Sequence, residues 1–143
     1  MTNNETKFLK KVRDATIADL LRRDISPIWQ RHSDLFFAGI ADVEIVVRTT
    51  QTTWVEFKWV DLPVRSDTMV TLVGSKALEG LQRHFLLERA QRGVRGMVVY
   101  GSAEGAYVCD NLGLLTLPTA VTKGVFLDLI NLRKPYSLSR WIY

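Results

Sequence analysis

Two short stretches, GIADVEIV at residues 39–46 and WVEFK at residues 54–58, carry the most informative pattern in the chain. The runs at 40–47 and 53–60 are rich in β-branched and aromatic residues, which favour strands. Polar residues 49–52 separate them. The sequence therefore predicts an antiparallel hairpin at this point.

The hairpin carries charged side chains at positions that should face each other. In a strand, side chains two apart share a face, so Glu56 and Lys58 lie side by side, as do Asp42 and Glu44 on the preceding strand. Asp42 and Glu56 can thus converge across the hairpin. Carboxylate oxygens suit Mg²⁺, which needs only one or two carboxylates besides waters and phosphate oxygens. The pattern indicates phosphodiester cleavage, with Lys58 orienting or activating a metal-bound water.

The same residues give the chain a resemblance to a known superfamily. Asp42 at the start of one strand, followed fourteen residues later by the Glu-x-Lys of Glu56 and Lys58, resembles the PD-(D/E)XK nucleases. These include phage and archaeal Holliday-junction resolvases and the VRR-NUC branch. The resemblance implies that Asp42, Glu56 and the backbone carbonyl of Phe57 bind Mg²⁺, for which Mn²⁺ can substitute. It also implies that Lys58 serves the nucleophile.

The resemblance continues beyond the hairpin. Ser75 and Gln82, then Gly93 and the apolar run 97–100, follow the order seen in such nucleases. Gln82 is then a candidate catalytic residue that positions DNA or the lysine, although an ordinary polar helix position explains it equally well. Ala41 stands where the family usually has proline, and because proline is not a ligand this departure leaves the metal site intact.

Apolar spacing and turn residues predict the remaining elements. Helices are expected at 5–23, 75–92 and 121–132, short strands at 97–100 and 106–109, a loop up to about residue 36 and an irregular segment at 61–74. The resemblance covers about residues 5–109. It implies an α/β fold with a restriction-endonuclease-like αββαβ core, in which helices flank a central mixed sheet. We expect one nuclease domain over residues 1–143, with a C-terminal helical extension at about 119–143.

The sequence allows two interpretations of several other polar residues. Some relatives use an acid of the first helix as an extra ligand, for which Glu5 is favoured over Asp14 and Asp19. Glu44 is either an accessory ligand or a solvated strand residue. His84 lies on a different side of its helix from Gln82, which favours a surface position.

Composition sets limits on the class of protein. A formal net charge of +4 and a pI near 9.4 suit a polyanionic partner without requiring one. Five basic residues either line a duplex channel or cover an exposed helix face: Lys76, Arg83, Arg89, Arg92 and Arg95. Trp54 shares the Glu56 face and is a candidate for stacking on unpaired bases. The single cysteine, Cys109, has no neighbours with zinc-ligand spacing and is expected to be a buried thiol.

These expectations combine into one functional hypothesis and its rivals. The leading one is a Mg²⁺-dependent DNA endonuclease acting on branched or duplex DNA during recombination. The resemblance also implies a homodimer, because two symmetric nicks on a junction need two active sites. The alternatives are a non-catalytic DNA-binding module and an interaction subunit of the same fold. The longest apolar runs are too short to cross a bilayer, and no secretion signal is evident, so we expect an intracellular protein, in the host cytoplasm if phage-encoded.

Overall fold

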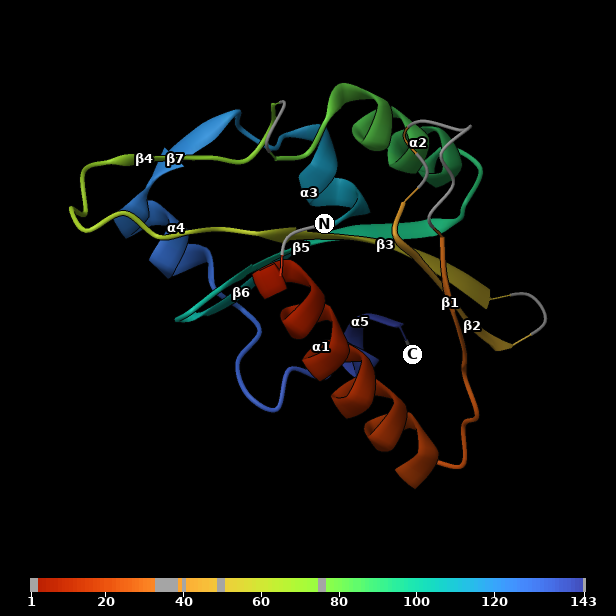
Figure 1. Ribbon diagram of the computed structural model, residues 1–143. Helices are drawn as coiled ribbons and strands as arrows, with labels where there is room; N and C mark the ends of the chain where they lie inside the picture. The colour runs from red at the N-terminus through yellow and green to blue at the C-terminus, as the bar shows by residue number, and fades with distance from the viewer. Residues whose placement is uncertain (1–2, 33–38, 40, 49–50, 75–76, 143) are drawn as a thin grey trace.

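The computed structural model describes residues 3–32, 39, 41–48, 51–74 and 77–142 (Figure 1). Its strands are β1 (Ile28–Arg31), β2 (Val43–Arg48), β3 (Gln51–Trp59), β4 (Met69–Thr71), β5 (Arg95–Ser102), β6 (Gly105–Asp110) and β7 (Ala120–Thr122). Its helices are α1 (Asn3–Arg22), α2 (Gly80–Ala90), α3 (Asn111–Leu115), α4 (Lys123–Leu129) and α5 (Ser139–Ile142). No helix within these ranges is both long enough and apolar enough to span a bilayer.

Five strands form the central sheet, in the order β1-β2-β3-β5-β6. The predicted hairpin is confirmed, because β2 and β3 pair antiparallel with Glu44 opposite Trp54. β3 then pairs parallel to β5, with Glu56 opposite Val98, and β5 pairs antiparallel to β6. The sheet is therefore mixed, as expected for an α/β fold, and its helices lie on both faces (Figure 1).

The alternation of strand side chains divides the core into two layers. On one face Val55 and Phe57 pack with Phe8 and Val12 of α1. On the other face Val98 and Tyr100 of β5 pack with residues of α2, α3 and α4, among them Leu86. Figure 1 shows α1 and α5 on one side of the sheet and α2 and α3 on the other. Cys109 is 1% exposed within the second layer, which confirms the buried thiol.

Two predicted irregular regions contain strands. The loop expected up to residue 36 includes β1, which pairs with β2. The segment expected to be irregular at 61–74 includes β4, which pairs with β7 and so forms a separate two-stranded sheet. Strands of four and three residues are too short to show a period in sequence, and their partners alone define them.

The second and last helices are shorter than predicted. The helix expected at 75–92 begins at Gly80, where the Glu79 N–H donates to Gln82 Oε1 (3.1 Å), and it stops before Gly93, whose φ of 78° only glycine adopts easily. Ser75 lies outside the described residues. The helix expected at 121–132 is α4, preceded by β7, with the Thr122 hydroxyl accepting from the Val125 N–H.

The C-terminal segment closes both the core and one edge of the sheet. Leu132, Leu138 and Ile142 are buried in the layer beneath α1. The backbones of Ala106 and Leu132 exchange hydrogen bonds, and the Asn131 side chain both donates to and accepts from the backbone of Val108. The last strand of the sheet, β6, therefore has its outer edge covered.

Candidate active site

Asp42 and Glu56 meet where the hairpin ladder ends. Asp42 lies just before β2, and its N–H donates to Glu56 Oε2 (3.0 Å). In return, the Phe57 N–H donates to Asp42 Oδ2 (2.9 Å). Each carboxylate is thus held by the backbone of the opposite strand. The structure brings these two acids together, on the sheet face that strand alternation indicates.

Glu56 is also bonded to two further side chains. Lys58 Nζ lies 3.2 Å from Glu56 Oε1, and Gln82 Nε2 donates to the same oxygen at 2.7 Å. The amide of Gln82 is itself oriented, because its Oε1 accepts from the Glu79 backbone at the start of α2. Glu56 is 1% exposed whereas the Lys58 side chain is 16% exposed, so the lysine forms the solvent side of the cluster.

Burial dominates the electrostatics of the acidic pair. It raises the pKa of Glu56 to about 8, helped by the charge of Asp42 and opposed by Lys58. Burial likewise raises the pKa of Asp42, against the opposing effects of the Phe57 amide and Lys58. The positive charge of Lys58 alone therefore does not offset the cost of burying two ionised carboxylates. An additional cation would stabilise both of them in the ionised form.

The donor set fits a hard divalent cation held with few protein ligands. The described residues contain no cluster of three or more His, Cys, Asp or Glu side chains close enough to hold a metal. Mg²⁺ does not need such a cage, because it retains several waters and usually binds one or two carboxylates. Asp42 and Glu56 supply those two. The buried Phe57 follows Glu56 directly and has its N–H committed to Asp42.

Of the three acids in the first helix, only Glu5 reaches this site. Burial raises the pKa of Glu5, while the charge of Lys58 lowers it and that of Asp42 raises it. A hydrogen bond from the Trp59 backbone also acts on its carboxyl. Asp14 instead pairs with Lys10, and Asp19 accepts hydrogen bonds from two serines of the C-terminal segment, Ser137 and Ser139.

The structure places Glu44 and His84 outside this cluster. Glu44 lies 3.4 Å from His32 Nε2, and the His32 ring packs against Trp54 with centroids 5.1 Å apart. His84 is 73% exposed and lies 3.0 Å from Glu88 on the outer side of α2. Glu44 therefore belongs to a neighbouring cluster, and His84 is at the surface.

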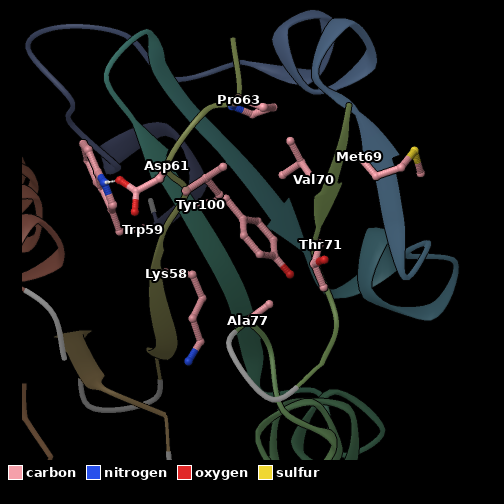
Figure 2. Close-up of a pocket in the computed structure, with 10 residues that line it drawn as sticks. Lys58, Trp59, Asp61, Pro63, Met69, Val70, Thr71, Ala77 and Tyr100 are labelled. Carbon is pink, nitrogen blue, oxygen red and sulfur yellow. Dashed lines mark hydrogen bonds between the residues drawn. The ribbon is translucent and has the colours of Figure 1, made fainter. Parts of the chain in front are cut away.

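A pocket of about 270 Å³ opens beside Lys58, between the end of β3, β4 and β5 (Figure 2). Tyr100 and Val70 point into it, and the Lys58 side chain lies along its edge. The Tyr100 hydroxyl donates to the Leu72 carbonyl, which fixes that wall. The sequence did not predict this pocket, because β4 becomes its wall only by pairing with β7. Space for a substrate therefore adjoins the lysine.

Two of the basic residues that the sequence assigned either to a duplex channel or to an exposed helix face lie toward opposite faces of the sheet. Arg83 and Arg95 donate to the carbonyls of Leu114 and Ile142, which belong to helices on opposite faces of the sheet. The Arg89 guanidinium lies 3.4 Å from the centre of the Phe85 ring. Trp54 packs in the same group, with its ring centre 5.6 Å from that guanidinium, so it is engaged in packing. Lys76 lies outside the described residues.

Comparison with known proteins supports the α/β fold described above. No protein-family model and no curated protein sequence matches the chain. Among solved structures it is similar to Hjc of the archaeal hyperthermophile Archaeoglobus fulgidus, a Holliday junction resolvase. The TM-score is 0.52 over 94% of this chain and 99% of that one, with 9% sequence identity. The protein therefore has a resolvase-like α/β fold, and at this identity the similarity extends to the fold alone.

Proposed function

We propose that the protein is a metal-dependent DNA endonuclease that hydrolyses phosphodiester bonds. The observation that carries the proposal is the convergence of Asp42 and Glu56, both held by the opposite strand, with Lys58 and Gln82 on the same carboxylate. The resolvase-like fold supports it, because this constellation lies on a scaffold that a junction-cutting enzyme also uses.

Asp42, Glu56 and the Phe57 carbonyl would hold a Mg²⁺ ion, for which Mn²⁺ would substitute. When bound, such an ion lowers the pKa of a coordinated water and offsets negative charge on the phosphate. Lys58 stands at the solvent side of the pair, where its ammonium orients the attacking water and neutralises charge on the phosphate. Gln82 keeps the Glu56 carboxylate in place, and Glu5 adds a further acid from α1.

The substrate class follows from the same proposal. A branched DNA, such as a four-way junction, is the first candidate because the fold is similar to that of a junction resolvase. A homodimer would place two such sites on one junction, so that two strands could be cut symmetrically. The formal net charge of +4 favours a polyanionic substrate of this kind.

The test is cleavage of labelled four-way junction, duplex and single-stranded DNA with Mg²⁺ or Mn²⁺ and with EDTA. Asp42→Asn and Lys58→Ala are expected to lower the cleavage rate by about 10²-fold or more, the lower range for loss of an acid–base group. Glu44→Gln is the matched control, since Glu44 shares the strand face of Asp42 but pairs with His32. Equal cleavage by all variants, or none on any substrate, would leave a DNA-binding module as the better account.

Gln82→Ala tests the positioning role of the helix residue. Because Gln82 acts through Glu56, its loss is expected to weaken activation by Mg²⁺ by about 10- to 100-fold, as for other groups that orient metal ligands. The concentration of Mg²⁺ giving half-maximal rate is the measurement. His84→Ala, on the exposed side of α2, should leave it unchanged.

A further inference from the structure

A second pocket, of about 190 Å³, lies between the first turns of α1, the end of β3 and the segment that follows α4. Three lysines line it, Lys7 and Lys11 from α1 and Lys134 from the C-terminal segment. Two partly exposed aromatic residues, Trp59 and Tyr136, complete its walls. We call it the lysine pocket.

The positive charge of the lysine pocket is not compensated. Lys7, Lys11 and Lys134 are exposed, and among the described residues none of them has an ion-pair partner. None of the described residues that line the pocket is acidic. By contrast Lys10, on the same helix, lies 2.7 Å from Asp14. Three ammonium groups that line one pocket repel one another and favour a bound anion.

The aromatic side chains give the lysine pocket an apolar surface suited to a flat ring. Phe8 is only 4% exposed, and its ring centre lies 5.8 Å from that of Trp59 and 5.5 Å from that of Tyr136. The indole of Trp59 is held in turn, because its Nε1 donates to Asp61 (Figure 2). A rigid aromatic surface beside clustered lysines is the combination that binds an unpaired nucleotide.

The lysine pocket adjoins the pocket beside Lys58 at the end of β3. Trp59, which follows Lys58 in the chain, lines both pockets. The helix that supplies Lys7 also carries Glu5 to within electrostatic reach of Asp42. A strand with a phosphate at Lys58 can therefore extend past Trp59 into the lysine pocket.

We propose that the lysine pocket binds an unpaired nucleotide of the substrate strand. Its phosphate is held by Lys7, Lys11 and Lys134, and its base lies against Trp59 and Tyr136. This proposal rests on the proposed nuclease function and adds a preference: DNA with an unpaired nucleotide beside the cleaved bond is bound more tightly than fully paired DNA.

The test separates binding from cleavage by working in EDTA. Binding of a short labelled oligothymidylate is followed by fluorescence anisotropy at several salt concentrations, with a blunt duplex in parallel. Replacing Lys7, Lys11 and Lys134 together by alanine is expected to reduce the slope of log affinity against log salt by about 0.7, the value for one phosphate contact to a single strand. Each single variant should give part of that reduction. Lys10→Ala is the matched control, from the same helix but outside the pocket.

The aromatic wall is tested by Tyr136→Leu against Tyr136→Phe. Loss of one stacking ring is expected to weaken oligothymidylate binding about 5-fold or more, whereas phenylalanine should bind as tyrosine does. Lysine variants that behave like Lys10→Ala, or a leucine variant that folds and binds normally, would overturn the proposal. If DNA is not cleaved but these binding effects appear, the nuclease proposal fails and the proposed role of the lysine pocket is supported. If DNA is cleaved but none of these variants changes binding, the nuclease proposal is supported and the proposed role of the pocket fails.

Discussion

Glu56 is a single carboxylate that joins three parts of the fold. It accepts from the backbone ahead of β2, contacts Lys58 within β3 and accepts from Gln82 of α2. All three partners favour its ionised form, yet burial outweighs them and keeps its pKa high. A cation bound beside Glu56 would therefore favour release of its proton.

This balance predicts how stability depends on pH without metal. The pKa of Glu56 is raised to about 8 in the folded protein, so between the ordinary glutamate pKa and that value the folded state binds more protons than the unfolded state. The free energy of unfolding then falls as pH rises through this window, by up to about 1.4 kcal/mol per pH unit for one proton. Thermal unfolding in EDTA at several pH values measures it.

Glu56→Gln is the control for that prediction. It removes the titrating proton while keeping the shape, so the loss of stability towards pH 8 should diminish. In the wild type, Mg²⁺ affinity should rise with pH up to about 8, because an ion held by Asp42 and Glu56 as proposed would bind their ionised form and release protons. Stability that does not change with pH in EDTA would contradict the assigned pKa.

At this scale the sequence predicts part of the site. Strand alternation is a local property, and it correctly indicated that Asp42 and Glu56 meet beside Lys58. The choice among Glu5, Asp14 and Asp19 depends on how α1 lies against the sheet, which no local pattern encodes. The lysine pocket escaped prediction for the same reason, since Lys134 joins Lys7 only through the packing of the C-terminal segment.

At the scale of elements, a close approach links α2 to the segment leading into the site. Gly39 has a φ of 89°, and a Cβ built there would lie 2.8 Å from the backbone oxygen of Leu81. Gly39 precedes Asp42 by three residues, and Leu81 adjoins Gln82. This contact therefore fixes the distance between the two elements that bring Asp42 and Gln82 together.

Gly39→Ala is expected to destabilise the protein by about 1–3 kcal/mol, because it combines a strained backbone conformation with a steric overlap. It should also slow DNA cleavage, since Asp42 is displaced from Glu56. Gly80→Ala is the matched control: a Cβ there meets nothing within 4 Å, and alanine favours the helix. Denaturant unfolding measures the free energy of unfolding of both variants. Equal values for Gly39→Ala and Gly80→Ala would show that the space between Gly39 and Leu81 can accommodate a side chain.

The elements themselves were predicted unevenly. α1, β2, β3, β5 and β6 have long or strongly apolar patterns and were found close to their observed bounds. The shortened start of α2 had a local signal, because Glu79 and Gln82 are spaced as a capping pair. β4 and β7 had none, since each is three residues long and exists only through a partner far away in the sequence.

At the scale of the whole molecule, the C-terminal segment is part of the core. Leu138 is fully buried beneath α1, and its N–H donates to the Thr16 hydroxyl (2.9 Å). Leu132 and Ile142 are buried in the same layer, so these residues of the segment close the core.

Leu138→Ala is therefore expected to lower the free energy of unfolding by about 2–5 kcal/mol, the usual cost of truncating a buried leucine. Leu115→Ala, at a residue that is 65% exposed, should change it by no more than about 0.5 kcal/mol. Urea unfolding followed by circular dichroism compares the two. A small effect at Leu138 would mean that the segment adds little to stability.

Among the described residues, Asn131 and Leu132 cover the β6 end of the central sheet, and β1 forms its other end. An accessible strand edge is a template on which another polypeptide can add by backbone pairing. A molecule with one such edge can join one neighbour and then stops, whereas a molecule with two can propagate into a ribbon. The C-terminal segment thus keeps β6 from serving as such a template, and removal of residues 131–132 would expose that edge.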